Sequence, residues 1–205
     1  QFVQVLTERW GGDVIDDWLT RIDAAATYTS ADERTVLDAL IAAQSGGTSS
    51  LSAAYRDYAE RIWDPTAWTT TAIASLYAYV SPAFTDATVS RGATTVSGGV
   101  AVDHLGARYV RARDLGVEPA GPDDRFRITG TGGAVPAVLV GNRPGGGRTR
   151  VPCSGASAAW TCDVPADPAT VMSAVLPLIN ESTASPAGDG RAFTWSVQLV
   201  PGTPA

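Results

Sequence analysis

The stretch TTVSGGVAVDHLGARYVRAR, residues 94–113, contains two runs rich in β-branched and small residues around a short polar segment. Runs of this kind, four to eight residues long and bounded by turn residues, are typical of strands. We interpret ARYVRAR, residues 107–113, as a half-solvated strand in which the side chains alternate between two faces. The segment between the runs has the character of a turn that enters a strand. The stretch therefore predicts two consecutive strands.

Similar short runs continue to the C-terminus, separated by Gly, Pro, Asp and Ser clusters. They are DRFRITG, AVLVGN, RTRVPC, AAWTCDV, VMSAVLPLI and FTWSVQLV. Their spacing is typical of an all-β sandwich. We therefore predict an immunoglobulin-like sandwich over residues 85–205.

The N-terminal part has a helical period instead. Phe2, Leu6 and Trp10 recur at intervals of four residues before two glycines. A second apolar stripe follows, for which Asp13 is placed as the N-cap. Ser30 begins the sequence SADE, which is typical of a capping box at the start of a third helix.

That third helix should stop at the sequence SGG, residues 45–47, and a fourth should begin near Leu51 and end before Pro65. We also interpret TAIASLYAYV, residues 71–80, as helical. The sequence therefore predicts an α+β protein, with a helical subdomain over residues 1–84 followed by the all-β domain over residues 85–205.

The overall charge restricts the partners. The net charge is −6 and the sequence pI is near 4.7, whereas nucleic acids and anionic membranes attract basic proteins. There is no apolar run of membrane-spanning length. We expect neither nucleic-acid binding nor membrane insertion. The chain opens with Gln1 and without an export signal, and we expect it to be a processed piece of a longer protein.

Cys153 and Cys162 are the only cysteines, and they enclose a short segment of mostly small residues. With a single histidine far along the chain they cannot supply a tetrahedral zinc site from soft ligands. A disulfide is the better interpretation, and disulfides are typical of oxidising compartments. We therefore expect a secreted, extracellular protein with a Cys153–Cys162 bond.

His104 is the only histidine and is the first candidate for a catalytic role. Serines and aspartates are plentiful, so counting residues does not exclude a Ser-His-Asp triad. However, the sequence lacks the G-x-S-x-G motif in a strand-to-helix context. We favour a structural or merely exposed histidine.

The carboxylates also have ordinary explanations. Three aspartates within residues 13–17 lie at a helix start, where the helix dipole favours negative charge. A glycosidase would need two of the many carboxylates across a cleft, which the sequence does not single out. Asp123, Asp124 and the Asp189-Gly190 turn could provide oxygens to calcium, but there is no D-x-D-x-D-G loop. We favour turn chemistry.

Trp160 is the one candidate binding residue. Most other tryptophans lie in the helical part, where their spacing predicts core positions. Trp160 instead lies between the two cysteines, where an exposed aromatic side chain would suit recognition of a peptide or a sugar. A capping contact on the sandwich is the alternative.

The order of these segments resembles a known family. FVQVLTERWGGDVIDDWLTRID (residues 2–23) and LDALIAAQSGGTSSLSAAYRDYAERIWDP (residues 37–65) resemble the helical region downstream of the catalytic helix in secreted, actinomycete-like bacterial zinc metallopeptidases of the gluzincin type. VDHLGARYV, PLINES and FTWSVQL resemble the β domain that ends such chains. The resemblance implies a helical lobe behind an active-site cleft, followed by an appended β module.

The chain lacks the zinc-binding motif HExxH of that family, so the resemblance carries over no catalytic residue. It implies zinc only in an upstream catalytic region, and no cofactor in this chain. The partners that we expect are that catalytic domain and a protein or polysaccharide ligand. The docking lobe should then expose an apolar patch near Phe2, Trp10 and Trp18. The alternatives are a free-standing binding or adhesion protein and a self-contained hydrolase that uses His104.

Overall fold

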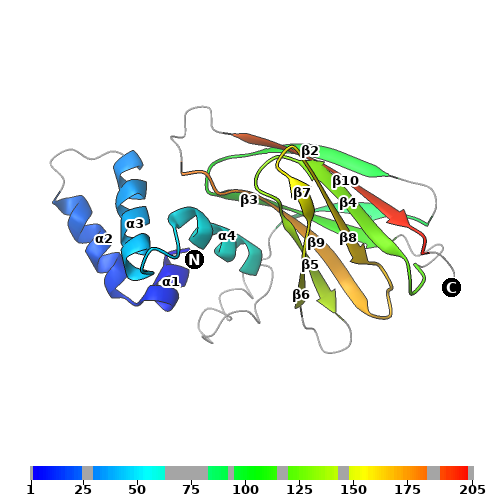
Figure 1. Ribbon diagram of the computed structural model, residues 1–205, viewed down its shortest axis with the longest axis horizontal. Helices are drawn as coiled ribbons and strands as arrows, with labels where there is room; N and C mark the ends of the chain where they lie inside the picture. Colours follow the sequence, from blue (N-terminus) through cyan, green and yellow to red (C-terminus); the bar gives the residue numbers. More distant parts are fainter. Residues whose placement is uncertain are drawn as a thin grey trace. The chain divides into compact units, whose positions relative to one another are not determined.

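The computed structural model describes residues 2–24, 30–62, 83–91, 95–114, 120–142, 148–183 and 190–202. It divides into a helical unit, Gln1–Ser81 with Glu181–Asp189, and a β unit, Pro82–Asn180 with Gly190–Ala205. Figure 1 shows the helices followed along the chain by the strands. The α+β class is confirmed, whereas the immunoglobulin-like arrangement stays a prediction. The segment 71–80, interpreted as helical, lies outside the described residues.

The helical unit contains α1 (Phe2–Trp10), α2 (Asp13–Asp23), α3 (Ser30–Gln44) and α4 (Leu51–Arg61). Its most deeply buried side chains are aliphatic and come from all four helices: Leu6, Val14, Leu40, Ile41 and Leu51. None of the described helices is both long enough and apolar enough to cross a membrane.

The helix ends follow the sequence signals in most cases. The side chain of Ser50 accepts a hydrogen bond from the backbone N–H of Ala53 at 3.2 Å and caps α4. Gly46 and Gly47 have positive φ angles and end α3, as the SGG sequence predicts. The predicted N-cap of α2 was wrong by one residue. Gly12 is the N-cap and makes no side-chain hydrogen bond, and Asp13 is the first helical residue.

The β unit consists of two five-stranded sheets, with the order β1-β3-β9-β5-β6 in sheet 1 and β2-β10-β4-β8-β7 in sheet 2. The strands are β1 (Phe84–Val89), β2 (Val96–Val102), β3 (Gly106–Asp114), β4 (Arg125–Thr131), β5 (Ala137–Asn142), β6 (Arg148–Pro152), β7 (Ser154–Ala156), β8 (Ala159–Pro165), β9 (Val171–Asn180) and β10 (Arg191–Val200). The pair β1/β3 is parallel, and the other pairs are antiparallel. β1 and β7 were not among the predicted strands.

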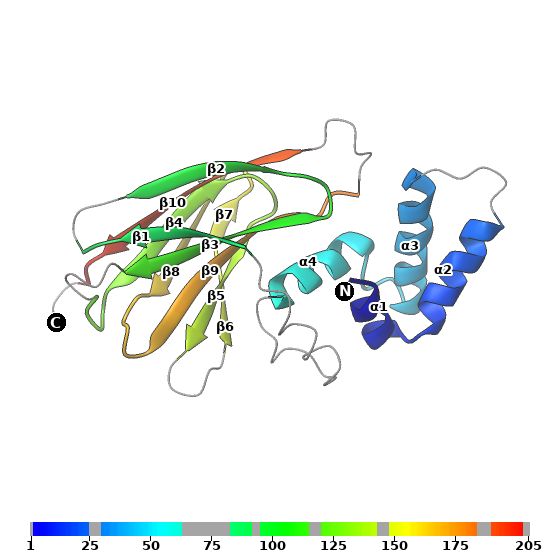
Figure 2. The same ribbon diagram turned by 180° about the vertical axis from the view of Figure 1, so that it is seen from behind.

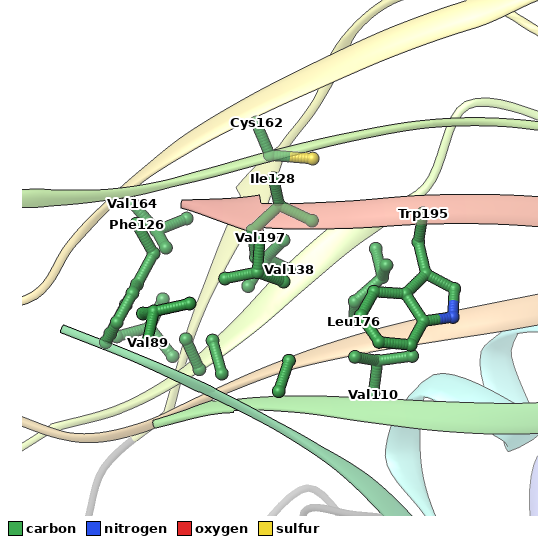
Figure 3. Packing of buried hydrophobic residues seen from close by; sticks show 14 of the residues in the cluster. Val89, Val110, Phe126, Ile128, Val138, Cys162, Val164, Leu176, Trp195 and Val197 are labelled. Atoms are coloured by element: carbon green, nitrogen blue, oxygen red, sulfur yellow. The ribbon is translucent and has the colours of Figure 1, made fainter. Parts of the chain in front are cut away.

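The two sheets share one hydrophobic core. Figure 3 shows Val197 of sheet 2 close to Val138 of sheet 1, and Trp195 of sheet 2 against Leu176 and Val110 of sheet 1. Along β10, buried residues alternate with more exposed ones, because successive side chains point to opposite faces. Each sheet therefore has one face in the core.

The disulfide lies where the chain passes from one sheet to the other. β6 at the edge of sheet 1 leads through Cys153 directly into β7 at the edge of sheet 2. Cys153 is bonded to Cys162 of β8, which confirms the predicted disulfide. This bond joins the connection between β6 and β7 to strand β8 of sheet 2. A disulfide also fits an extracytoplasmic location.

The carboxylate of Asp124 connects the C-terminal end of the β unit to the loop before β4. It is almost fully buried, accepts the N–H groups of Gly121 at 2.8 Å and Gly202 at 2.9 Å, and forms an ion pair with Arg91. The composition of PGTPA, residues 201–205, predicts a frayed end, but the backbone N–H of Gly202 is hydrogen-bonded here. The C-terminal end of the β unit is therefore fastened to the loop before β4.

Candidate functional site

Trp160 does not provide an exposed platform. Its side chain is 2% exposed, and its indole N–H lies 3.4 Å from the backbone oxygen of Gly132. β7 and β8 pair as a tight hairpin, so Trp160 is a strand residue, and it shares its buried face with Cys162 and Val164. The prediction that Trp160 is exposed was wrong, and the burial favours the alternative of a capping contact on the sandwich. A binding role of Trp160 stays a prediction.

Trp160 belongs to a row of residues that crosses the inner side of sheet 2. By register the row is Gly98, Trp195, Gly130, Trp160 and Gly155, one residue from each strand. A Cβ atom added at Gly98 would lie 2.6 Å from Cζ2 of Trp195, and one at Gly130 would lie 2.5 Å from Cζ2 of Trp160. Each indole ring therefore occupies the space that a neighbouring side chain would need.

Next to this row, on the outer side of the same sheet, lies a row of hydroxyl side chains. Ser97 pairs with Ser196, Ser196 with Thr129, Thr129 with Thr161, and Thr161 with Ser154. The row therefore crosses all five strands. The hydroxyls of Thr129 and Ser196 are hydrogen-bonded to each other at 2.7 Å. Because directly opposite residues are close together, the hydroxyls form a continuous polar strip.

A shallow depression of about 540 Å³ lies over this strip. It is lined by three consecutive residues each of β4, β8 and β10 and by two of β2: Thr129–Thr131, Ala159–Thr161, Thr194–Ser196, and Ser97 with Gly98. Six of these residues carry hydroxyl groups, and no lining residue is charged. We call this surface the hydroxyl face.

A second polar row borders the strip. Gln198 lies opposite Arg127, and Arg127 lies opposite Asp163. The Arg127 guanidinium donates two hydrogen bonds to the Asp163 carboxylate, at 2.8 and 2.9 Å. This hydrogen bonding, although opposed by desolvation, lowers the pKa of the Asp163 carboxyl below its usual value. The row therefore presents fixed planar groups beside the hydroxyls.

His104 lies in the short turn between β2 and β3 and is half-buried. The following residue, Leu105, has a φ of 46°, in the left-handed region that is uncommon for a residue with a side chain. In the described ranges no three His, Cys, Asp or Glu side chains come together as a possible metal site. The structural role of His104 stays a prediction.

The two candidate calcium ligands that are described behave differently. Asp124 uses its oxygens for Gly121, Gly202 and Arg91, as given above, whereas Asp123 is exposed. Asp189 lies outside the described residues. Asp124 therefore makes the hydrogen bonds of a turn residue and one ion pair, in line with the turn interpretation.

The helical unit has apolar side chains at its surface. Val3 of α1 is 43% exposed and Leu19 of α2 is 52% exposed, while Phe2, Trp10 and Trp18 are half-buried. On α2, Val14 is the buried residue, although the helix has a long apolar stripe. The stripe is thus only partly covered by the described residues.

Sequence reasoning missed the hydroxyl face. The signal was the period-two spacing of Thr129 with Thr131 and of Thr194 with Ser196, which places each pair on one side of a strand. The order of the strands then brings these pairs side by side.

Comparisons with known proteins add little. No protein-family model matches the sequence, and no curated protein does. Among solved structures, the periplasmic inhibitor PliG of g-type lysozyme from Aeromonas hydrophila is similar over 58% of this chain and 100% of its own, at 17% identity and a TM-score of 0.29. At that level the likeness assigns neither a function nor a ligand to this chain.

Proposed function

We propose that this chain is the noncatalytic accessory region of a secreted metallopeptidase, and that its β unit binds a polysaccharide on the hydroxyl face. The observation that carries the binding role is the depression over six hydroxyl-bearing residues on neighbouring strands. The β unit then acts as an immunoglobulin-like module, and the helical unit as the lobe that docks to the catalytic part.

The chemistry of the hydroxyl face suits a neutral polyhydroxylated ligand. Each Ser or Thr hydroxyl both donates and accepts hydrogen bonds, as the hydroxyls of a sugar do. The planar side chains of Gln198, Arg127 and Asp163 stand beside them, and such groups can bind two adjacent sugar hydroxyls at once. A long chain of sugars can lie along the strip and contact several strands.

The hydroxyl face is also preformed. Its Ser and Thr side chains are short, so binding orders few rotatable bonds. The backbone beneath the strip is supported from inside by the buried rings of Trp160 and Trp195. Preformed polar sites lose less entropy on binding than flexible ones, which favours recognition without large side chains.

The docking role of the helical unit is supported by two features. One is the sequence resemblance to the helical lobe of gluzincin-type enzymes. The other is the partly uncovered apolar stripe of α2 with the exposed Leu19, since exposed apolar surface commonly marks an interface.

Sedimentation with insoluble polysaccharides tests the binding role. The protein is mixed with cellulose, chitin or bacterial peptidoglycan, and the bound fraction is measured against protein concentration. We expect binding to at least one of them, and a loss of about tenfold in affinity for the double variant Thr129→Val, Ser196→Ala, since about two hydrogen bonds are removed. Thr85→Val, on β1 of the other sheet, is the control and should bind normally.

Two results would contradict the binding role: no sedimentation with any of the three polysaccharides, or equal affinity of the double variant and the control. The link to a metallopeptidase is tested separately by sequencing the gene in frame upstream of the Gln1 codon. We expect HExxH and a downstream glutamate. An export signal that ends at Gln1 would refute the metallopeptidase link and leave a free-standing binding protein.

A further inference from the structure

We infer that the free edge of β2 pairs with β2 of a second copy of this chain, so that sheet 2 continues across a two-fold axis. This goes beyond the proposed function, because neither accessory role nor polysaccharide binding requires a dimer. The inference rests on the edge strands, on the indole of Trp195, and on the residues of β2 itself.

The two sheets have four edge strands, and three of them carry features that discourage pairing. β7 is only three residues long. β6 contains Arg148, Arg150 and Pro152. β1 presents Asp86, which is ion-paired with Arg111. Short strands, charges and prolines are the usual means by which proteins protect sheet edges.

β2 has none of this protection. It is seven residues long, with the sequence VSGGVAV, and contains neither a charged residue nor a proline. Val96 and Val100 pack against the core of the β unit but stay partly exposed. An unprotected edge strand of this length and composition is a template for a further strand.

The side chain of Trp195 reaches the same edge. It is 7% exposed, and its indole N–H is not among the buried polar atoms that lack a hydrogen-bond partner in the described part of the chain. Nε1 lies 3.2 Å from the Cβ position of Gly98 on β2. In Figure 3 this nitrogen is on the side of the ring turned away from the other labelled residues.

Gly98 has no side chain, so the edge of the indole reaches the outermost strand of the sheet. A strand added beside β2 would cover this edge of the indole. The same strand would cover Val96 and Val100.

The composition of β2 favours an identical strand as the occupant. In an antiparallel pair centred on Gly99, Val96 lies opposite Val102, and Ser97 lies opposite Ala101 of the other copy. Val100 of one copy lies opposite Gly98 of the other, where the indole edge is. Because the strand is uncharged, no like charges are brought together, although the whole chain carries a net charge of −6. The two copies thus fit each other in size and in charge.

The test introduces two charged residues of the same sign on β2. In the register above, the double variant Ser97→Lys, Ala101→Lys places lysines opposite lysines, and Ser97→Glu, Ala101→Glu places glutamates opposite glutamates. Both residues are exposed, so the variants should fold and melt like the unmodified protein. The molar mass is measured by light scattering after gel filtration over a range of protein concentrations, including those used for NMR.

We expect the unmodified protein to dimerise with concentration, and each charge variant to associate at least about tenfold more weakly. An equimolar mixture of the two variants should restore the dimer. The control Thr85→Lys, on the neighbouring edge strand β1, should dimerise normally. In the dimer, the indole N–H resonance of Trp195 should shift and exchange more slowly with solvent.

Three outcomes would overturn the inference. The unmodified protein could remain monomeric at every concentration. The charge variants could dimerise as well as the unmodified protein, which would place the interface elsewhere. The Trp195 resonance could be the same in monomer and dimer, which would exclude pairing at the β2 edge.

Discussion

Replacing Asp124 by asparagine should destabilise the β unit, and the loss should depend on pH. Asparagine preserves the shape of the side chain, but its NH2 group cannot accept the N–H of Gly121 or Gly202. A hydrogen bond to a charged buried group contributes about 1.5–3 kcal/mol. The Arg91 side chain is 41% exposed, so its ion pair adds at most about 1 kcal/mol. We expect Asp124→Asn to lower the free energy of unfolding by about 2–4 kcal/mol.

The pH dependence follows from the pKa of Asp124. Burial by itself raises the pKa of this carboxyl, but the N–H groups of Gly121 and Gly202 together with Arg91 outweigh burial, and the pKa lies below its ordinary value. The unfolded chain then binds more protons than the folded protein in this range. The stabilisation is therefore complete above the unfolded pKa, about 3.9, and is lost as the pH falls through the folded pKa.

Thermal unfolding followed by circular dichroism measures both effects. At neutral pH the melting temperature of Asp124→Asn should be about 5–15 °C lower than that of the unmodified protein, and the difference should shrink below about pH 4. Asp163→Asn is the control, because the Asp163 pair with Arg127 is solvent-exposed and should matter less. A difference between Asp124→Asn and the unmodified protein that is absent at neutral pH, or constant at acid pH, would refute the reasoning.

Three further predictions concern single features. Gly130→Ala should destabilise the β unit by about 1–3 kcal/mol in urea unfolding, since the new Cβ would lie 2.2 Å from the backbone oxygen of Thr194 and 2.5 Å from the Trp160 ring; an unchanged midpoint would contradict this close packing. Reduction of Cys153–Cys162, which are nine residues apart, should lower stability by about 2–3 kcal/mol, measured by melting with and without reductant. Tyr55 should ionise only near pH 12, because burial and then the neighbouring Tyr58 raise its pKa to about 12; the difference in absorbance near 295 nm between the unmodified protein and the Tyr55→Phe variant follows this, and ionisation of Tyr55 near pH 10 would contradict it.

The sequence predicted those elements whose signal is local. The helices follow the spacing of apolar side chains, and most strands follow runs of β-branched residues. β7 has the sequence SGA, which contains no β-branched residue, and it is a strand only because it pairs with β8. β1 pairs in parallel with β3, and this pairing leaves no local turn signal between the two strands.

The site was harder to predict because it depends on which strands are neighbours. Thr129 and Ser196 are far apart in the chain and meet only because β10 lies beside β4. The exposure of Trp160 was predicted wrongly for a related reason. Its position between two cysteines suggests an exposed loop, whereas the pairing of β8 with β4 and β7 directs its side chain into the core.

The order of the strands also has a consequence for how the β unit is made. The chain passes several times between the sheets, and β10, the last strand, lies between β2 and β4 in sheet 2 (Figure 2). A ribosome that has not yet delivered Arg191–Val200 has therefore produced β2 without a neighbour in sheet 2, although β4, β8 and β7 of that sheet are already present. Sheet 2 therefore becomes complete only when synthesis is nearly finished, because β2 is joined to it through β10. Truncation before Arg191 should then leave β2 without a partner strand in sheet 2.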